Sequence, residues 1–296
     1  MKNLRPLLIL VPGIIWGVSF VVTELILPYI PPISLTLIRA LISVVMLFFL
    51  LNQSGGYLPK TFADWRPFLI LGLLNQALPF TLTAWGQRFI DSGLATILIS
   101  TMPLFTVLIA HFFTTDEKLN TPKSIGILLG LAGIIVLIGP EALSGIGFNF
   151  VAQLAVVASA LSYSMAAVYT RFVYPMQPEG LSMWALRLRI TLAQFIGSLV
   201  ILLPLSLLID QPWTIRAPIS VWLYMLFLGI GVTMLATLVY FYLIETMGAG
   251  KASTTIYLIP VSGIILGVFV LGEVFTLWMG ISLALILAGI TISSRG

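Results

Sequence analysis

Two runs of five hydrophobic stretches, the second repeating the first, are the feature that most constrains how this chain can fold. Each stretch has about 20 mainly apolar residues, the length that a helix needs to cross a bilayer. The stretches lie at about 6–27, 33–51, 67–88, 94–113, 124–140, 151–173, 182–209, 219–245, 251–271 and 276–293. We therefore predict an all-α integral membrane protein with ten transmembrane helices.

The repeat is carried by residue types that apolar sequences rarely match by chance. Shifts of 148 to 157 positions superpose an arginine, a glutamate and a proline of each half. These pairs are Arg39 with Arg187, Glu117 with Glu273, and Pro103 with Pro260. Because five is an odd number, the second copy must cross the membrane inverted relative to the first. We predict two five-helix repeats, residues 1–145 and 146–296, with a substrate site where they meet, as in secondary transporters.

Composition excludes several other classes of protein. Only 8% of the residues are charged and 59% are hydrophobic, so a soluble fold could not bury the apolar surface and the lipid bilayer is the expected partner. The net charge of +4 comes from basic residues scattered singly, which argues against nucleic acid. The chain has no cysteine, so neither a disulfide framework nor a thiolate metal site is expected. No metal and no cofactor are predicted, and the first stretch, without a cleavage site, is expected to be a retained helix.

Lysine and arginine placement predicts the orientation. With the N-terminus inside, nine basic residues lie in cytoplasmic segments and two, Arg88 and Arg216, lie in loops on the opposite face. The nine are Lys2, Arg5, Lys60, Arg66, Lys118, Lys123, Arg171, Lys251 and Arg295. We expect both termini in the cytoplasm and the protein in the cell membrane, which for a bacterium is the inner membrane.

Several short motifs carry a family resemblance along nearly the whole chain. They are Trp16-Gly17-x-x-Phe20, Pro103-Leu104-Phe105 leading to Asp116-Glu117-Lys118-Leu119-Asn120, Leu131-Ala132-Gly133, and the second copy from Pro260 through Gly272-Glu273 to Ala288-Gly289. Together they resemble the ten-helix, EamA-type branch of the drug/metabolite transporter superfamily. The resemblance implies alternating access by rocking of two inverted halves. It leaves the solute open, because that family carries amino acids, sugars, nucleotide derivatives and drugs.

Polar and aromatic residues at helical spacing predict which faces line a central cavity. One stripe carries Gln76, Phe80, Thr83 and Gln87, and its repeat mates include Thr233, Thr237 and Tyr240. A second stripe carries Thr96, Ser100, Pro103 and His111, with Ser253, Tyr257 and Pro260 as mates. A single Ser or Thr often bonds only its own helix or a neighbour, but recurrence in both halves favours a shared path. Trp16 and its mate Tyr163 lie too deep for the interfacial aromatic belt. The predicted cavity residues are Trp16, Gln76, Phe80, Thr83, Ser100, Pro103, Tyr163, Thr233, Thr237, Tyr240, Tyr257 and Pro260.

The charged residues within the stretches receive separate predictions. Glu24 and Arg39 flank the Pro31-Pro32 turn at similar depth, which predicts a buried ion pair or, alternatively, a gate near the outer mouth. Arg187 is expected to face the interior, and Arg189, about 200° away around the helix, to reach the cytoplasmic surface. Glu117 and Glu273 are interpreted as residues that orient the hairpins at their helix ends. Small-residue faces, with Gly126, Gly130 and Gly133 on one stretch and Gly280, Ala284 and Ala288 on another, predict close helix packing or a dimer face.

The predicted function is secondary transport of small neutral or zwitterionic metabolites such as amino acids, with export as the expected direction. If transport is coupled to protons, His111 is the candidate residue. We expect instead a facilitator or exchanger that moves the solute down its gradient. Alternative cargoes are organic anions, sugars or phosphorylated metabolites, and proton-coupled drug efflux is another alternative. A channel or a non-transporting receptor also stays open. Enzymatic motifs such as HExxH and GxSxG are missing, so no enzyme is expected. The protein is expected to be a monomer or a weak homodimer.

Overall fold

The computed structural model describes residues 8–115, 118–144, 147–173, 180–247 and 253–294, and within these ranges every regular element is a helix. Seven helical segments are long and apolar enough to cross a membrane: Pro32–Gln53, Phe62–Gly86, Ser92–Phe113, Thr121–Ile138, Phe148–Val173, Met183–Asp210 and Ile219–Leu243. Three shorter apolar segments are Leu10–Ile26, Thr255–Leu271 and Leu277–Ser293. These segments coincide with the hydrophobic stretches of the sequence, and they make a multi-pass membrane protein.

Short changes of helix type divide several of these segments. The α-helices are α2 (Leu10–Ile26), α3 (Pro32–Gln53), α4 (Phe62–Gly72), α5 (Leu78–Gly86), α6 (Ser92–Ile99), α7 (Met102–Phe113), α8 (Thr121–Ser144), α9 (Phe148–Val173), α10 (Met183–Leu205), α11 (Ile219–Leu226), α12 (Ala236–Met247), α14 (Leu258–Leu266) and α15 (Leu277–Ser293). The π-helical pieces are η2 (Leu73–Ala77), η4 (Ser206–Asp210), η6 (Phe227–Leu235) and η8 (Gly267–Leu271). The 3₁₀ pieces are η5 (Pro212–Thr214) and η7 (Ser253–Tyr257).

Local sequence signals fix where helices begin. Pro32 opens α3, where its missing N–H costs nothing. The Ser182 hydroxyl accepts a hydrogen bond from the Ala185 N–H at the start of α10. Thr61 and Asp64 form a capping box at the start of α4. The third membrane segment therefore begins about five residues before the expected boundary at 67, and Pro67 lies inside the first turns of α4.

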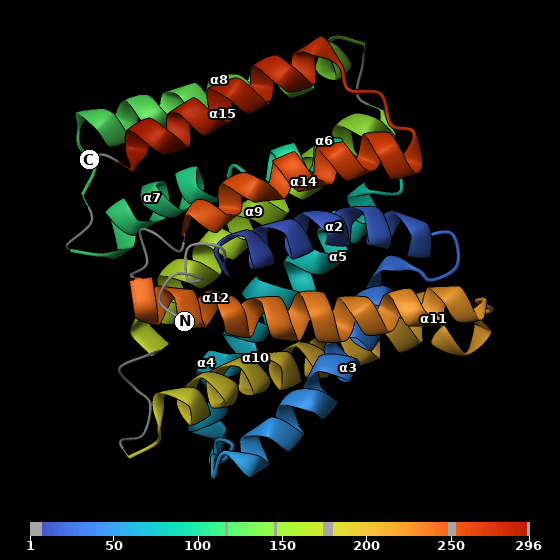
Figure 1. Cartoon of the computed structure of the whole chain (residues 1–296), viewed down its shortest axis with the longest axis vertical. Coiled ribbons are helices and arrows are strands. Elements are labelled where there is room, and N and C mark those ends of the chain that lie inside the picture. Colours follow the sequence, from blue (N-terminus) through green and yellow to red (C-terminus); the bar gives the residue numbers. More distant parts are fainter. Residues whose placement is uncertain (1–7, 116–117, 145–146, 174–179, 248–252, 295–296) are drawn as a thin grey trace.

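The largest contacts between helices are related by exchange of the two halves of the chain (Figure 1). α8 lies along α15, and α3 lies along α10. The packing of α2 on α14 is matched by that of α9 on α6 and α7. The packing of α5 on α9 is matched by that of α12 and η6 on α2. The boundary expected between residues 145 and 146 lies outside the described residues, and the two-domain division stays a prediction.

Glycines permit the closest of these helix contacts. A Cβ atom on Gly126 of α8 would lie 2.4 Å from the backbone oxygen of Gly289 of α15. A Cβ atom on Gly17 would lie 2.6 Å from the backbone oxygen of Ile259 in α14, which explains the glycine in the Trp16-Gly17 motif. Gly289 of α15 lies in the contact with α8, whereas Ala284 and Ala288 are exposed, and a dimer face at these residues stays a prediction.

Both halves contain a π-helical piece at the same place in the repeat. η2 begins directly after Gly72, and η6 contains Gly229, which the shift of 157 superposes on Gly72. A Cβ atom on Gly72 would meet the backbone of α10, and one on Gly229 would meet α3. π-Helical turns occur often at functional sites because they redirect the side chains that follow. Each piece here contains the first residue of a predicted polar stripe, Gln76 in η2 and Thr233 in η6.

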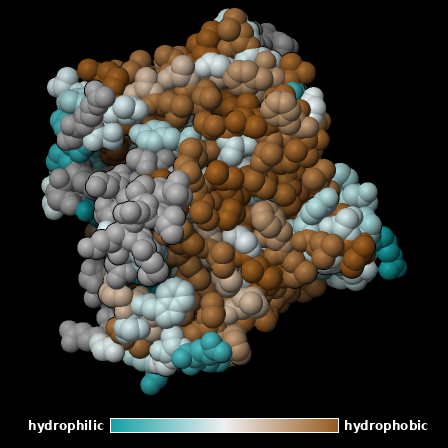
Figure 2. All heavy atoms as spheres, in the orientation of Figure 1, coloured by the Kyte–Doolittle hydropathy of each residue, from teal (hydrophilic) through white to brown (hydrophobic). Residues whose placement is uncertain are grey.

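The surface has the distribution expected of a membrane protein. A broad apolar band crosses the visible face, and hydrophilic residues gather at the two ends of the helices (Figure 2). Exposed apolar side chains such as Phe49, Leu208, Phe269 and Leu277 belong to helices that run through the protein. In water this surface would be an aggregation hazard, but within lipid it is the favourable contact.

Candidate functional site

Two edge-to-face aromatic pairs lie between the halves of the chain. The rings of Trp16 in α2 and Tyr240 in α12 have centroids 5.3 Å apart. The rings of Phe80 in α5 and Tyr163 in α9 have centroids 5.9 Å apart. Trp16 and Tyr163 are repeat mates, so exchange of the halves converts the helices of one pair into those of the other. The structure thus brings these four predicted cavity residues into two related contacts across the interface.

Arg39 links one aromatic pair to the polar stripe of η6. Its guanidinium carbon lies 4.0 Å from the centroid of the Phe80 ring, a cation–π contact. Its Nε and Nη2 atoms donate hydrogen bonds to the Thr233 hydroxyl oxygen, at 3.0 and 2.8 Å. The Thr233 hydroxyl donates its own proton to the backbone oxygen of Leu228. Arg39 is only 5% exposed.

The prediction of an ion pair between Glu24 and Arg39 is wrong, because the two side chains have other partners. Glu24 accepts a hydrogen bond from the Ser92 N–H at 3.1 Å and lies beside Glu273 and Asp91. Equal depth along two helices does not bring side chains together, because rotation about each helix axis decides which neighbour they meet. Here α2 presents Glu24 to the start of α6, whereas α3 presents Arg39 to η6.

Glu24, Asp91 and Glu273 form an acidic cluster at the first residues of α6. Glu273 accepts hydrogen bonds from the N–H groups of Ser92 and Gly93, at 2.8 and 2.9 Å, and from the Ser92 hydroxyl. Burial and, secondarily, the nearby Glu273 carboxylate raise the pKa of Asp91 above its ordinary value. We predicted that Glu273 orients the hairpin at its own helix end. The hydrogen bonds of Glu273 instead join the second half of the chain to the first. Within the described residues no group of three or more acidic or histidine side chains can hold a metal ion.

The stripe on α5 makes contacts between helices. The hydroxyls of Thr83 and Ser159 are 2.8 Å apart, which joins α5 to α9. Gln87 donates from Nε2 to the backbone oxygen of Phe20, at 2.9 Å, which joins α5 to α2. Gln76 is buried, and its Oε1 atom has no hydrogen-bond partner among the described residues. The partner Ser159 was missed by the sequence analysis, although it lies one turn before Tyr163.

The stripe on α6 instead satisfies its own helix. Thr96 donates its hydroxyl to the backbone oxygen of Gly93, and Ser100 donates to that of Thr96. Both residues are buried, and Thr96 also packs against Gly263 of α14. Here the alternative of local bonding is what the structure has. Ser100 therefore contributes to the break between α6 and α7.

The prolines and the remaining cavity candidates lie at helix interruptions or half-buried on helix faces. Pro103 is the second residue of α7, directly after the break, and Pro260 is the third residue of α14, after η7. Tyr257 is half-buried and, like Tyr163, packs against the apolar cluster that contains Ile97 and Val156. Thr237 lies half-buried between Thr233 and Tyr240 on one helix face. The side chain of Ser253 and residue Glu117 lie outside the described residues.

Arg187 of α10 is buried as expected, whereas Arg189 has other surroundings than expected. Arg187 and Arg189 are both only 5% exposed. Arg189, expected at the surface, is covered by the loop before α4, where it donates to the backbone oxygen of Tyr57 and lies on that ring. His111 accepts a hydrogen bond from the Leu119 N–H through Nδ1, at 3.1 Å. The histidine thus holds the connection between α7 and α8.

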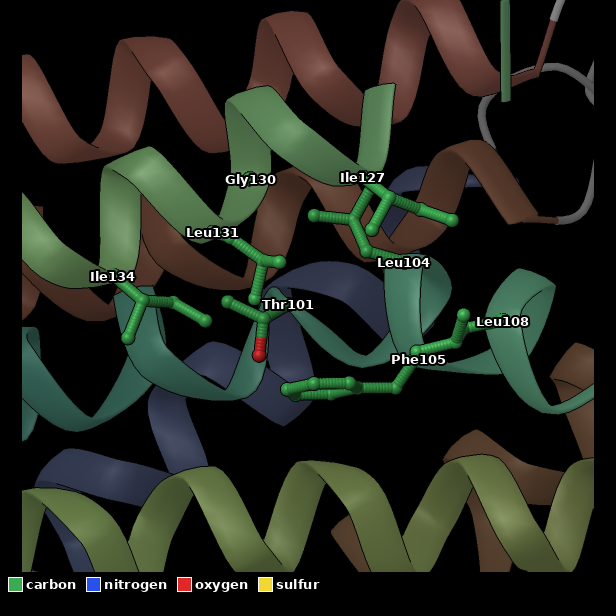
Figure 3. Close-up of a pocket in the computed structure, with 8 residues that line it drawn as sticks. All are labelled: Thr101, Leu104, Phe105, Leu108, Ile127, Gly130, Leu131 and Ile134. Atoms are coloured by element: carbon green, nitrogen blue, oxygen red, sulfur yellow. The ribbon is translucent and has the colours of Figure 1, made fainter. Parts of the chain in front are cut away.

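A small pocket is lined by none of the predicted cavity residues. It is enclosed by α7, α8 and the residue before α7, and only Thr101 among its lining residues is polar (Figure 3). Its volume of about 20 Å³ has room for about one water molecule. The lining residues are Thr101, Leu104, Phe105, Leu108, Ile127, Gly130, Leu131 and Ile134. Because Thr101 donates its hydroxyl to the backbone oxygen of Leu98, the pocket offers no polar group to a solute.

Comparison with known proteins places the chain among transporters. The EamA-like transporter family matches it twice, over residues 4–139 and 150–295. The "Uncharacterized transporter YoaV" of Bacillus subtilis (strain 168) is 28% identical over 94% of this chain and 92% of its own length. The "Uncharacterized inner membrane transporter YedA" of Escherichia coli (strain K12) is 26% identical over 96% of this chain and 88% of its own. A solved crystal structure with 20% identity shares the fold over 99% of this chain and 98% of its own, with a TM-score of 0.66.

Proposed function

Because the chain belongs to the EamA-like transporter family, we propose that it is a secondary transporter, working as an exporter, for small neutral or zwitterionic metabolites such as amino acids. It is a multi-pass membrane protein, and we place it in the cell membrane, which for a bacterium is the inner membrane. The YedA relative is named as an inner membrane transporter. In the proposed topology the chain crosses the membrane ten times and both termini lie in the cytoplasm.

The symmetric packing of the helices supports two inverted five-helix repeats. The main contacts between a helix of one half and a helix of the other occur as related pairs, such as α2 on α14 and α9 on α6 and α7. Inverted repeats allow alternating access, because two arrangements of equivalent halves expose a central site to opposite sides of the membrane. The proposed transport cycle is a rocking of one half against the other.

The related aromatic pairs are the single observation that carries the proposed site. Each pair, Trp16 with Tyr240 and Phe80 with Tyr163, has one ring from each half. A rocking motion therefore separates the rings and opens apolar surface to a solute, while Thr83 and Thr237 supply polar contacts nearby. Edge-to-face pairs stabilise the closed arrangement by only about 0.5–1.5 kcal/mol each. Such contacts can be broken and remade in each cycle.

The coupling we propose is downhill transport or exchange of solutes. His111, the candidate for proton coupling, lies at one end of α7, is held by the backbone of Leu119 and belongs to neither aromatic pair. A residue that binds a coupling proton must change its exposure together with the substrate site. A pH gradient that strongly accelerates transport, with that effect lost in His111→Ala, would contradict downhill transport.

Counterflow into proteoliposomes tests the function and the site together. Purified protein is reconstituted, and uptake of labelled amino acids is measured with and without the same solute inside. We expect saturable uptake that internal solute stimulates, and a fall of at least tenfold in Trp16→Ala and Tyr240→Ala. Trp278→Ala is the matched control, because Trp278 is 53% exposed on α15 and belongs to neither pair.

The outcomes separate the rival interpretations. Uptake that does not saturate would indicate a channel, and binding without uptake would indicate a receptor. Saturable uptake that survives in both pair variants would move the site elsewhere. If folded wild-type protein moves no amino acid, sugars and phosphorylated metabolites become the next panel.

A further inference from the structure

Arg39 carries an inference about the chemistry of the cargo. It lies in α3, about 10 Å along the helix from its first residue. Among the residues that the structure describes, its guanidinium donates to the Thr233 hydroxyl, lies over the Phe80 ring and interacts electrostatically with Tyr163, and no carboxylate pairs with it. The nearest candidate in the sequence, Glu24, is bonded to Ser92 instead. Arg39 is thus a cation held inside the protein without a counter-charge from the described chain.

Burying an unpaired arginine lowers the stability of the folded protein, which suggests that the residue has a function. A buried charge loses its hydration and is stabilised only by an opposite charge or by several hydrogen bonds. Ionisable residues inside membrane proteins accordingly mark substrate or ion pathways. A neutral hydroxyl and an aromatic ring compensate Arg39 only in part. The missing compensation is what an anionic group of a solute would supply.

The contacts leave one edge of the guanidinium without a hydrogen bond among the described residues. Thr233 occupies the edge formed by Nε and Nη2, with both N–H groups directed at one oxygen. The Thr233 proton is itself directed to the Leu228 backbone oxygen, so Thr233 is held as an acceptor. The other edge, formed by Nη1 and the second N–H of Nη2, donates to no acceptor among the described residues. Two parallel N–H groups at one edge match the two oxygens of a carboxylate.

The surroundings of this edge favour a carboxylate on an apolar body. The guanidinium carbon of Arg39 lies over the Phe80 ring, and Tyr163 packs edge-on against Phe80. Both rings belong to the proposed substrate site and offer apolar surface to the rest of the solute. A compact, strongly hydrated anion gains nothing from these rings.

We propose that the Nη1–Nη2 edge of Arg39 binds the carboxylate of the transported solute, whose apolar part lies against Phe80 and Tyr163. This inference rests on the proposed transport function and narrows its substrate class to small carboxylates, either zwitterionic amino acids or organic anions. Thr233 is a positioning residue, which orients the guanidinium without touching the solute.

Three solutes that share one carbon skeleton test the proposal. Leucine carries both a carboxylate and an ammonium group, 4-methylpentanoate carries only the carboxylate, and 3-methylbutylamine carries only the amine. Binding is read from the solute-dependent shift in the unfolding temperature of detergent-purified protein, and transport from counterflow. We expect wild type to bind and move the two carboxylates but not the amine.

Substitutions at Arg39 then assign the effect to this side chain. Arg39→Lys keeps the charge but loses the two-pronged edge, and it should raise the KM for both carboxylates at least tenfold. Arg39→Gln should abolish their thermal shifts. Arg189→Gln is the matched control, since Arg189 is as buried as Arg39 but is bound to the Tyr57 backbone oxygen. If Arg39→Gln does not fold, the KM of Arg39→Lys and the wild-type solute preference still decide.

Failure of this inference differs from failure of the proposed function. Three results would overturn the role of Arg39 while saturable transport persists. The KM of Arg39→Lys could be unchanged, or the amine could be transported as well as the carboxylates. Wild type could also show a thermal shift with inorganic phosphate but none with either carboxylate. Carboxylate binding lost in Arg39→Gln, without transport by wild type, would support the site and contradict the transporter. If wild type neither binds nor transports either carboxylate, the inference is overturned.

Discussion

Glu273 accepts a hydrogen bond from the backbone N–H of Ser92, which lies 181 positions earlier in the chain, at a distance of 2.8 Å. The other oxygen of the same carboxylate accepts from the Gly93 N–H. The second half of the chain thus supplies the carboxylate that satisfies the first N–H groups of α6 in the first half. A negative charge at a helix N-terminus is also favoured by the helix dipole.

Glu273→Gln should destabilise the protein. Glutamine keeps one acceptor oxygen but loses the charge, and hydrogen bonds to charged groups contribute about 1.5–3 kcal/mol. We expect the unfolding temperature in detergent to fall by several degrees. Glu24→Gln is the comparison, because Glu24 reaches only the Ser92 N–H and lies beside the Glu273 carboxylate. Equal losses in the two variants would show that Glu273 has no special part in joining the halves.

Asp91→Asn should stabilise the protein at alkaline pH and leave it unchanged at acidic pH. Burial and Glu273 raise the pKa of Asp91. A carboxyl group with a raised pKa binds its proton more tightly when folded, so its stabilising contribution is complete below about pH 4 and is lost as the pH rises through the raised value. Asparagine cannot ionise and avoids this loss. We expect an unfolding temperature about 1–2 °C above wild type at pH 8.

Control measurements at low pH test whether the stabilisation by Asp91→Asn comes from the ionised carboxylate. Near pH 4 both proteins should unfold at the same temperature, because Asp91 is then protonated in both states. In the Glu273→Gln background the difference at pH 8 should shrink, since the neighbouring charge is gone. A variant that is less stable than wild type at pH 8 would mean that the attraction of the Asp91 charge to the positive end of the α6 dipole outweighs the cost of its burial.

Hydropathy and helix signals predicted most of the fold from the sequence. The segment Ser92–Phe113 was expected at 94–113, and Leu277–Ser293 at 276–293. Lipid leaves few choices to an apolar stretch of this length, because every backbone group must be bonded within the helix. The π-helical pieces η2 and η6 were not predicted. Nothing in the composition of these apolar segments distinguishes an i→i+5 turn from an ordinary one.

The site was predicted as a set of positions but not as a set of contacts. The stripe with Phe80 and Thr83 and its mate with Thr233 and Tyr240 lie on the helices that contribute to the two aromatic pairs. The partner of Arg39 was wrong, because the depth of a residue follows from sequence spacing whereas the rotation of its helix follows from packing against several neighbours. A single sequence contains the first kind of information directly and the second only through the whole fold.

Gly126→Ala should separate α8 from α15. The new Cβ atom would lie 2.4 Å from the Gly289 backbone oxygen, and neither backbone can yield without moving its helix. Overpacking of this kind costs about 1–3 kcal/mol, which should lower the unfolding temperature. Gly280→Ala is the matched control on α15, since its Cβ atom would meet only the Phe275 ring at 3.6 Å, an ordinary contact. Equal effects in the two variants would contradict close packing at Gly126.

The orientation of the chain can be tested by labelling, because the natural sequence contains no cysteine. A cysteine at the exposed Lys60, Lys60→Cys, and one at the exposed Arg216, Arg216→Cys, lie in loops predicted on opposite sides of the membrane. A membrane-impermeant maleimide added to intact cells should label Arg216→Cys alone, and permeabilised cells should show both. The loops alternate sides along the chain, so this result also places the bonds of Glu273 with Ser92 at the outer mouth. Labelling of Lys60→Cys alone would reverse the orientation and put the same bonds on the cytoplasmic side, where they would close the entrance for a solute to be exported.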